Sequence, residues 1–526
     1  MQLPMSASLR AGAFPVALLA ALVAAPAAAQ TTPAAPTSPP ADSVVADTAA
    51  LPVRPPAPPP EGAITLTDAV ARAQERGLDA RNAERALDAA RWRDRAFDAQ
   101  FRPRLALTAD AADLNSSFIP LTLPSGETQF VRQSFTRNFV QLGVEQPLPW
   151  TGGALTFGSR LTRVVQDQAA GGSVERWQST PLIVGLRQAL FQPRALVWDR
   201  REQDLGLDVA ERQFVEARED VATQTATAFF DLYAAQVRFE NATGNVAVND
   251  TLYTLNQGRY EVGKIGENDL LQSELALLNA RATLDGARLE LDRAAAALRR
   301  LLRLPPDAPI AASTPPVAPA MQIDTAIAVR QALRNVSALP QTDLQVLRAR
   351  RQVAEAKADA GFTADVEASF GFDQTATGFS DAYASPLERQ QFTLSVGLPL
   401  VQWGAGRAQV SAARAEQARA EGQFEARREQ VEEEARFAAR QLMQAQRFLA
   451  ISAKADTVAA KRFDVAKNRY VIGRIGINDL YVAQNEKDAA VQSYVQALRG
   501  YWAAHYRLRR LTLYDFETGR ELIGGR

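Results

Sequence analysis

The chain has 526 residues, 47% of them hydrophobic, with 59 basic and 59 acidic side chains. It contains no cysteine and a single histidine, His505. These counts exclude a disulfide framework, a cysteine nucleophile and a thiolate metal site, and they leave almost no room for histidine-based zinc or triad chemistry. The balanced charge also lacks the basic footprint of a nucleic-acid binder. We therefore expect no enzymatic activity, no cofactor, no metal and no nucleic-acid partner.

The N-terminus has the pattern of an export signal. Arg10 supplies a short positive region, residues 11–25 form an apolar run, and the small residues 27–29 offer a cleavage site. Residues 30–62 are rich in proline and cannot pack a core, so they are expected to form a disordered linker. The sequence therefore predicts an exported chain whose folded part starts near Ile64.

The rest of the chain repeats itself. The segments RYEVGKIGENDL at 259–270 and RYVIGRIGINDL at 469–480 are identical at eight of twelve positions. The offset of 210 residues between them holds back to Leu182 and Phe392, whereas an earlier pair of segments starting at 101 and 362 has an offset of 261. We infer an internal duplication whose first half carries 51 additional residues between about 113 and 182.

Each half is predicted to contain a pair of very long helices. Apolar and small residues recur with alternating spacings of four and three, which is the pattern of coiled-coil packing. Residues 200–260 contain no proline, so one helix there could run on the order of 90 Å. Glycine pairs then mark a tight turn, and Asn268 or Asn478 is a plausible cap of the returning helix. The return helices are expected to end near Leu304 and Leu513.

The segments between the helices alternate apolar and polar residues with a period of two. The alternation is clear over 140–145, 155–162, 365–373 and 391–398. A soluble sheet with a polar outer face would give the same pattern. However, the strands approach the 9–11 residues that a tilted membrane strand needs, and no later strands are available to close a second sheet. We therefore favour a transmembrane β-barrel with a polar interior over a soluble sheet.

The connections between these strands are predicted to alternate in length. Loops 114–137 and 166–178 are expected to be long and the connection 147–153 short, as in barrels with long extracellular loops and short periplasmic turns. On this basis the first half supplies four strands and the second half two. Three tryptophans lie at predicted strand ends: Trp150, Trp177 and Trp403. A position at the membrane interface and ordinary packing explain them equally well.

A barrel of four to six strands cannot close on its own, because at least about eight strands are needed to enclose an interior. The chain must therefore pool its strands with copies of itself around a cyclic axis. Three copies would give about 12 or 18 strands, and two or four copies would also close.

Three segments of the sequence resemble those of a known family. The opening helix at 66–70, the helix-to-strand passage at 101–103 and the paired turns with the pattern Arg-Tyr-x-x-Gly-x-x-x-x-x-Asp-Leu are similar to those of the TolC family of outer-membrane efflux ducts. The resemblance covers roughly residues 64–515. It implies a homotrimer in which a barrel in outer-membrane lipid continues into an α-helical tunnel across the periplasm.

The resemblance also implies partners at the periplasmic end. The two turns would be tips that dock on a membrane-fusion adaptor protein, which works with an inner-membrane transporter that supplies the energy. The implied docking residues are Val262, Gly263, Lys264, Ile265, Ile472, Gly473, Arg474 and Ile475.

The family closes the tip end with a constriction of aspartates and of tyrosine or arginine links. By motif, the implied gate residues are Asp269, Asp479, Tyr260, Tyr470 and Arg474. Rings of acidic side chains favour cations and can gate a pore, although a carboxylate in the first turn of a helix is also explained by the helix dipole alone. Val482 stands where the prototype of the family has a second carboxylate, and Ile475 stands where it has its tip arginine.

The predicted fold is mixed and mainly α-helical: a trimeric transmembrane β-barrel continuous with a long periplasmic α-helical coiled-coil barrel, built from an internally duplicated protomer. The predicted divisions are a signal peptide (1–29), a linker (30–62), a first repeat with one helix, four strands and a long helical hairpin (63–304), a Pro-rich connector (305–320), a second repeat with one helix, two strands and a hairpin (321–515) and a tail (516–526).

The predicted function is a passive duct of a tripartite efflux or type I secretion system that exports small molecules or proteins. The predicted location is the outer membrane of a Gram-negative bacterium, with an extension into the periplasm. The alternative is a periplasmic coiled-coil adaptor or a non-conducting scaffold that spans the envelope.

Overall fold

The computed structural model describes residues 62–167, 172–313, 315, 319 and 321–523. All of these residues belong to one compact unit, Pro56–Arg526. The predicted signal peptide lies outside the described residues, and so does the predicted linker up to residue 61.

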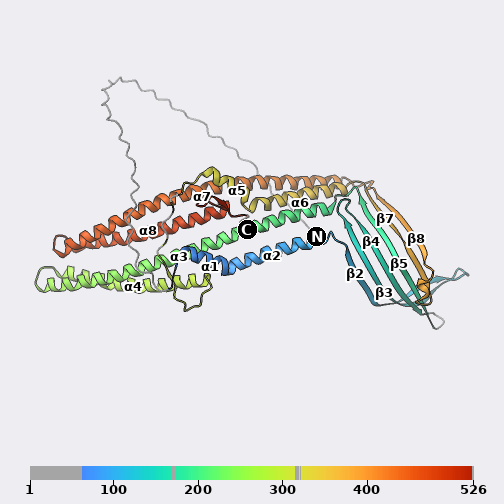
Figure 1. Ribbon diagram of the computed structural model, residues 1–526, viewed down its shortest axis with the longest axis horizontal. Helices are drawn as coiled ribbons and strands as arrows, with labels where there is room; N and C mark the ends of the chain where they lie inside the picture. Colours follow the sequence, from blue (N-terminus) through green and yellow to red (C-terminus); the bar gives the residue numbers. More distant parts are fainter. Residues whose placement is uncertain (1–61, 168–171, 314, 316–318, 320, 524–526) are drawn as a thin grey trace, which may run out of the picture. The chain divides into compact units, whose positions relative to one another are not determined.

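The described helices fall into two sets of closely matching lengths (Figure 1). The first set is α1 (Leu66–Arg76), α2 (Leu78–Ala99), α3 (Ala195–Glu261) and α4 (Glu267–Leu301). The second set is α5 (Thr325–Asn335), α6 (Ala338–Asp359), α7 (Ala405–Val471) and α8 (Ile477–Thr512). α3 and α7 have 67 residues each, which corresponds to about 100 Å of helix. The long helix expected over 200–260 is thus part of α3.

Side-chain caps start the short helix that opens each set. The hydroxyl of Thr65 accepts a hydrogen bond from the backbone N–H of Asp68 at 3.1 Å, and the carboxylate of Asp324 accepts one from Ala326 at 2.7 Å. Two short pairings complete the described chain: β1 (Ala63–Ile64) with β6 (Ala311–Ala312), and β9 (Tyr514–Asp515) with β10 (Arg520–Glu521).

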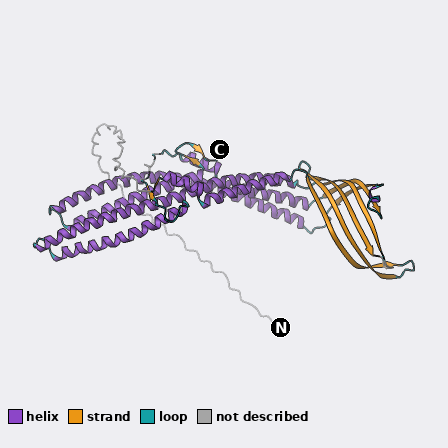
Figure 2. Ribbon diagram, turned by 60° about the horizontal axis from the view of Figure 1, so that its bottom comes forward, coloured by secondary structure: helices purple, strands orange, loops and turns teal. Residues whose placement is uncertain are grey.

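The main sheet has six antiparallel strands in the order β2-β3-β4-β5-β7-β8 (Figure 2). Their bounds are β2 (Arg104–Thr122), β3 (Thr128–Leu148), β4 (Gly153–Asp167), β5 (Ser173–Leu190), β7 (Thr363–Ala376) and β8 (Leu387–Gly397). A short 3-10 helix, η1 (Asp381–Tyr383), lies between β7 and β8 in the sequence. β2 and β8 are the two edges of the sheet.

The strands of the first half extend far beyond the 9–11 residues that a membrane strand needs. β2, β3, β4 and β5 have 19, 21, 15 and 18 residues. The expected long loop at 114–137 is wrong, because β2 and β3 stay paired as far as Thr122 and Thr128. The expected loop at 166–178 is wrong at its C-terminal side, where β5 already begins at Ser173. Polar side chains do not prevent pairing, since the ladder is made by backbone groups.

One face of the main sheet is apolar across neighbouring strands. The register places in one row Leu105, Val144, Phe157, Val184 and Phe370. The adjacent row points to the other face and contains Glu145, Thr156, Gly185, Ser369 and Gln391. Leu105 is 65% exposed and Phe370 45% exposed, so nothing in the single chain covers the apolar face at these positions.

The main core lies where α1, α3, α7 and α8 meet. Leu66, Phe229, Phe230, Leu442 and Tyr501 are all buried there. α3 packs along both α4 and α8, and α7 packs along α8 and α6. None of the described helices is both long enough and apolar enough to cross a membrane.

Candidate gate and docking site at the helical tips

The two hairpins turn in the same way. Gly263 and Gly473 have φ of +69° and +75°, a conformation that side chains rarely adopt, and each lies at the end of a long helix. The backbone N–H of Gly263 donates to the carbonyl of Tyr260 at 2.8 Å, and that of Gly473 donates to Tyr470 at 2.9 Å. The repeated sequence therefore builds the same turn twice.

The return helices begin at glycine, which corrects one expectation from the sequence. Gly266 and Gly476 occupy the N-cap positions of α4 and α8, without a side-chain cap. Asn268 and Asn478 are the second residues of α4 and α8, which is too late in the helix for them to serve as N-caps. Instead, the Oδ1 of Asn478 accepts a hydrogen bond of 2.6 Å from the Nε2 of Gln272, which joins α8 to α4.

The predicted docking residues form the surface of both turns. Val262 is 67% exposed and Ile472 65% exposed. The cationic residues Lys264 and Arg474 are also exposed, whereas Ile265 and Ile475 are half-buried against the tips. Both turns thus present one apolar and one basic side chain to solvent, and their role in docking stays a prediction.

The two motif tyrosines lie in different surroundings. Tyr260 is 41% exposed, whereas Tyr470 is only 5% exposed. The hydroxyl of Tyr470 donates to the Oδ1 of Asn256 on α3 at 2.7 Å, and Asn256 itself is fully buried. This contact joins α7 of one hairpin to α3 of the other.

A second α3 residue reinforces this junction. The guanidinium of Arg259 lies 5.2 Å from the centroid of the Tyr470 ring, and its Nη2 donates to the carbonyl of Val471 at 3.1 Å. Around the ring, an apolar cluster contains Leu252, Phe463, Ile477 and Leu480. We call the contact of Tyr470 with Asn256 and Arg259 the tip latch.

The predicted gate aspartates are not part of the tip latch. Asp269 is half-buried in the first turn of α4, and Asp479 is exposed in the first turn of α8. Within the described part of the single chain, neither carboxylate has an ion-pair partner. The structure therefore does not pair Asp269 or Asp479 with Tyr260, Tyr470 or Arg474, and their role as a gate stays a prediction.

Asn256 is the functional candidate that the sequence analysis missed. It occupies a stripe on α3 with Asn245, Asn249 and Leu252, at spacings of four, three and four. Three asparagines on the buried seam of a coiled coil are a signal that could have identified it, because polar residues at such positions set register and partners.

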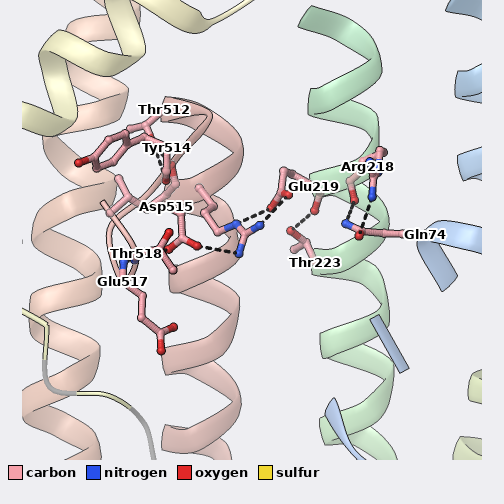
Figure 3. A network of polar contacts seen from close by, with 11 residues as sticks. Gln74, Arg218, Glu219, Thr223, Thr512, Tyr514, Asp515, Glu517 and Thr518 are labelled. Carbon is pink, nitrogen blue, oxygen red and sulfur yellow. Dashed lines mark hydrogen bonds and ion pairs between the residues drawn. The ribbon is translucent and has the colours of Figure 1, made fainter. Parts of the chain in front are cut away.

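A buried ion pair fixes the base of the hairpins (Figure 3). The Nε and Nη2 of Arg509 on α8 donate to both oxygens of Glu219 on α3 at 3.0 and 3.1 Å, and Arg509 also lies 3.7 Å from Asp515. Burial raises the pKa of Glu219, and Arg509 opposes that rise. The side chain of Gln74 on α1 donates to the carbonyl of Arg218, next to this pair. From Glu219 to the tip, α3 then runs about 60 Å.

The tips hold neutral and cationic polar groups. Among the described residues, no group of three or more histidines, cysteines, aspartates and glutamates is placed to hold a metal ion. The polar contacts at the tips join neutral amides, a phenol and a guanidinium.

Comparison with known proteins identifies the fold. Residues 153–302 match the family described as outer membrane efflux protein. The solved outer-membrane channel OprN is 18% identical, with a TM-score of 0.61 over 85% of this chain and 89% of that chain. The CmeC outer-membrane channel of Campylobacter jejuni is 14% identical, with a TM-score of 0.60 over 87% and 86%. The outer membrane protein VceC of Vibrio cholerae is 16% identical, with a TM-score of 0.61 over 86% and 96%.

No curated protein sequence gives a match. The family match and the shared fold agree with the predicted location, the outer membrane with an extension into the periplasm. The resemblance to the TolC family of outer-membrane efflux proteins, which the sequence predicts, is therefore confirmed.

Proposed function

We propose that the chain forms the outer-membrane channel of a tripartite efflux or type I secretion system, through which small molecules or proteins pass without energy input from the channel itself. The observation that carries this proposal is the apolar row across five strands of the main sheet, from Leu105 to Phe370, in a chain that also has two helical hairpins. The long helices of these hairpins start next to the sheet and place their turns about 100 Å away along the helices. An adaptor protein and an inner-membrane transporter would complete the system.

Lipid is the proposed partner of the apolar face. A sheet of six strands is below the number of about eight that encloses an interior, and both of its edges are unpaired in the single chain. In a homotrimer, β8 of one copy would pair with β2 of the next, and three copies would supply about 18 strands. The polar row from Glu145 to Gln391 would then line the lumen.

The internal repeat supports a ring of helices as well. Asn245 on α3 donates to Asp488 on α8 at 2.6 Å within one chain. The offset of 210 residues maps Asn245 to Ala455 on α7, and it maps Asp488 to Leu278 on α4. Ala455 lines an open groove of about 700 Å³ on the outside of α7 and α8, and Leu278 on α4 is 54% exposed. α4 of a neighbouring copy would fill this groove, as α8 covers α3 within one chain.

Further exposed apolar residues lie along α7 and α4. They are Ile451, Val458 and Val465 on α7, and Leu271, Leu275 and Leu289 on α4. The α7 residues recur every seven positions, which is the repeat of a coiled-coil seam. Such stripes are rarely left open to water, so a second copy is their proposed cover.

The tips would close the duct and dock on the adaptor. In a trimer, Asp269 and Asp479 would form carboxylate rings near the narrow end, and Arg474 would lie beside them on the tip surface. The tip latch would hold the two hairpins of each copy together in the closed state. The exposed Val262 and Ile472, each beside a basic side chain, suit a partner with apolar and acidic groups.

Membrane fractionation tests the proposal against its alternative. We expect the full chain to stay in outer membranes washed with carbonate and urea, and to run as a trimer in detergent. A periplasmic adaptor or a scaffold without a barrel would be released by the wash, and release would contradict the proposal.

The orientation of the sheet can be tested in intact cells. The β3–β4 turn lies beside the start of α3, because Arg194 donates to the carbonyl of Trp150 at 2.9 Å, so this end should face the periplasm. A membrane-impermeant maleimide should label Ser125→Cys in the β2–β3 turn and leave Thr151→Cys unlabelled. Labelling of Thr151→Cys in intact cells would overturn this orientation.

A further inference from the structure

Ion pairs join the two halves of one chain next to the main sheet. α3 begins directly after β5, α6 ends directly before β7, and the two helices pack together. The Nη1 of Arg351 on α6 donates to the Oδ1 of Asp199 on α3 at 2.5 Å and to the Oε1 of Glu202 at 3.1 Å. Arg348, one turn earlier, donates to the other oxygen of Glu202 at 3.0 Å. The side chains of Arg351 and Glu202 are only 24% and 17% exposed, so this contact is a partly buried ionic seam.

The helices of the two halves align at a fixed offset, so each contact has an equivalent. Three pairs of buried residues are separated by 259 positions: Ala69 and Ala328, Ala73 and Ala332, and Leu87 and Val346. Arg91 on α2 pairs with Glu211 on α3 at 3.5 Å. Their equivalents Arg350 on α6 and Glu421 on α7, at offsets of 259 and 210, pair at 3.1 Å. α2 therefore lies on α3 in the register in which α6 lies on α7.

The same offsets map the ionic seam onto α2 and α7, where no charge remains. Arg351 maps to Trp92 on α2. The two carboxylates of α3 map to Gln409 and Ala412 on α7. Trp92 is 64% exposed, and Gln409 and Ala412 are exposed as well. The equivalent of a buried contact within the chain is thus open to solvent on both helices.

The surface of α7 at this level is made of small side chains. Ala408, Ala412 and Ala415 are exposed and follow one another at spacings of four and three, so they form one stripe on the helix. α3 has a larger residue at each of the three equivalent positions: Trp198, Glu202 and Leu205. The stripe on α7 therefore leaves room for a bulky side chain that α3 does not leave.

Trp92 supplies such a side chain. The guanidinium of Arg95, one turn further along α2, lies 4.7 Å from the centroid of the Trp92 ring, so it covers one face of the indole and leaves the other free. Tryptophan is enriched among the residues that anchor protein interfaces, where its large apolar ring fills a complementary surface. The free face of Trp92 thus matches the alanine stripe of α7 in size and in polarity.

We propose that Trp92 of one copy docks on Ala412 of the next copy, against the alanine stripe of α7. The contact continues the one proposed between α4 and the groove on α7, because α2 and α4 belong to the same half of the neighbouring copy. It rests on the proposed trimer and adds to it a specific anchor. The halves of one chain are joined by ion pairs at this level, whereas the copies are joined by an apolar contact.

Rebuilding the ionic seam between copies tests the anchor in the full-length protein purified from outer membranes. Trp92→Arg should raise the rate at which trimers dissociate on heating in detergent at least about tenfold, since replacing a tryptophan anchor removes most of its contact. Adding Gln409→Asp/Ala412→Glu gives the arginine two carboxylates and should return the rate close to that of the wild type. This rescue should be lost in about 1 M salt, whereas the wild-type rate should not rise.

Glu84→Arg is the matched control. Glu84 is exposed on α2, and its equivalent on α6, Asp343, is exposed as well, so neither residue lies in a seam. The variant introduces an arginine into the same helix and should dissociate at the wild-type rate.

Cross-linking tests the register with Trp92 in place. Ala89 is the equivalent of Arg348, so it should lie close to Ala412 of the next copy. Since the chain has no native cysteine, a short bis-maleimide should link Ala89→Cys/Ala412→Cys into multimers on a denaturing gel. Ala89→Cys/Gln423→Cys moves one cysteine about 16 Å along the same face of α7 and should stay monomeric.

The other possible occupant of this surface is lipid, and the same variants exclude or reveal it. A lipid contact of Trp92 would not respond to changes on α7. Equal dissociation rates in the wild type and Trp92→Arg, no rescue by Gln409→Asp/Ala412→Glu in low salt, or equal cross-linking of the two cysteine pairs would overturn the anchor. Each of these results would leave the trimer in place, whereas a wild type that purifies as single chains would contradict the proposed function itself.

Discussion

The hydroxyl of Tyr470 on α7 donates a hydrogen bond of 2.7 Å to the Oδ1 of Asn256 on α3, and both side chains are buried. This bond joins the two hairpins of one chain close to the tips. The equivalent tyrosine of the first half, Tyr260, is 41% exposed, so the duplicated motif has one structural and one surface copy. The two halves are therefore not interchangeable at the point where we propose that the duct closes.

Tyr470→Phe tests the tip latch through stability. The substitution leaves the Oδ1 of Asn256 buried without a donor, beside an Nδ2 that already lacks a partner, so it should cost about 1–3 kcal/mol. Tyr470→Phe/Asn256→Leu removes both partners and should recover most of that loss. Thermal unfolding in detergent measures both effects. Tyr260→Phe should change little, and an equal loss in Tyr260→Phe and Tyr470→Phe would contradict a special role for Tyr470.

Asp269→Ala/Asp479→Ala should weaken block of the channel by divalent cations. Carboxylate rings at the narrow end would concentrate cations, and their removal should raise the blocking concentration about tenfold or more. Asp285→Ala serves as the control, because Asp285 is exposed on α4 about 25 Å from the turn. Unchanged block in the double variant would leave the helix dipole as the sufficient explanation for both aspartates.

Ala455→Cys/Leu278→Cys tests the contact between copies. The chain has no native cysteine, so any disulfide must come from the introduced pair. If α4 of a neighbour fills the groove on α7, oxidation should produce linked multimers on a denaturing gel, because the two Cα atoms must approach within about 7 Å. Ala455→Cys/Leu289→Cys moves one partner about 16 Å along α4 and should stay monomeric. Equal cross-linking of the two pairs would refute the proposed register.

His505 predicts a pH dependence of stability. Burial, with a contribution from Arg509, lowers the pKa of His505 to about 4, against 6.5 for an unperturbed histidine. Below pH 6.5 the unfolded chain takes up a proton that the folded chain does not, so stability is lost as pH falls towards 4, by about 3 kcal/mol at most. Since the sequence has a single histidine, His505→Phe should remove this part of the slope of Tm against pH. The same slope of Tm against pH in the variant and the wild type would contradict this role of His505.

The helical part of the fold could be predicted from the sequence because its signals are long and repeated. A stretch without proline over 200–260 permitted one continuous helix, and the repeated glycines at 263 and 473 located both turns. The caps were predicted wrongly at Asn268 and Asn478, since a short polar side chain near a helix start does not by itself fix which residue is the N-cap.

The strands were harder to predict. Residues such as Asn115, Ser116 and Ser117 are polar on both faces and were assigned to a loop, yet β2 continues through them because its ladder depends on the pairing with β3. The pairing of distant residues is also why Asn256 was missed. Its partner, Tyr470, lies in the other half of the chain, and the sequence does not state which turn of α3 meets which turn of α7.

Single-channel recording in planar bilayers tests the central claim most directly, with the wild type purified from outer membranes and the Tyr470→Phe variant measured side by side. We expect the wild type to open in small, cation-selective steps, and Tyr470→Phe to open more often or in larger steps, because the tip latch has lost its hydrogen bond. A wild type that inserts stably and never conducts, together with an equally silent variant, would contradict a duct that is constricted at its helical tips.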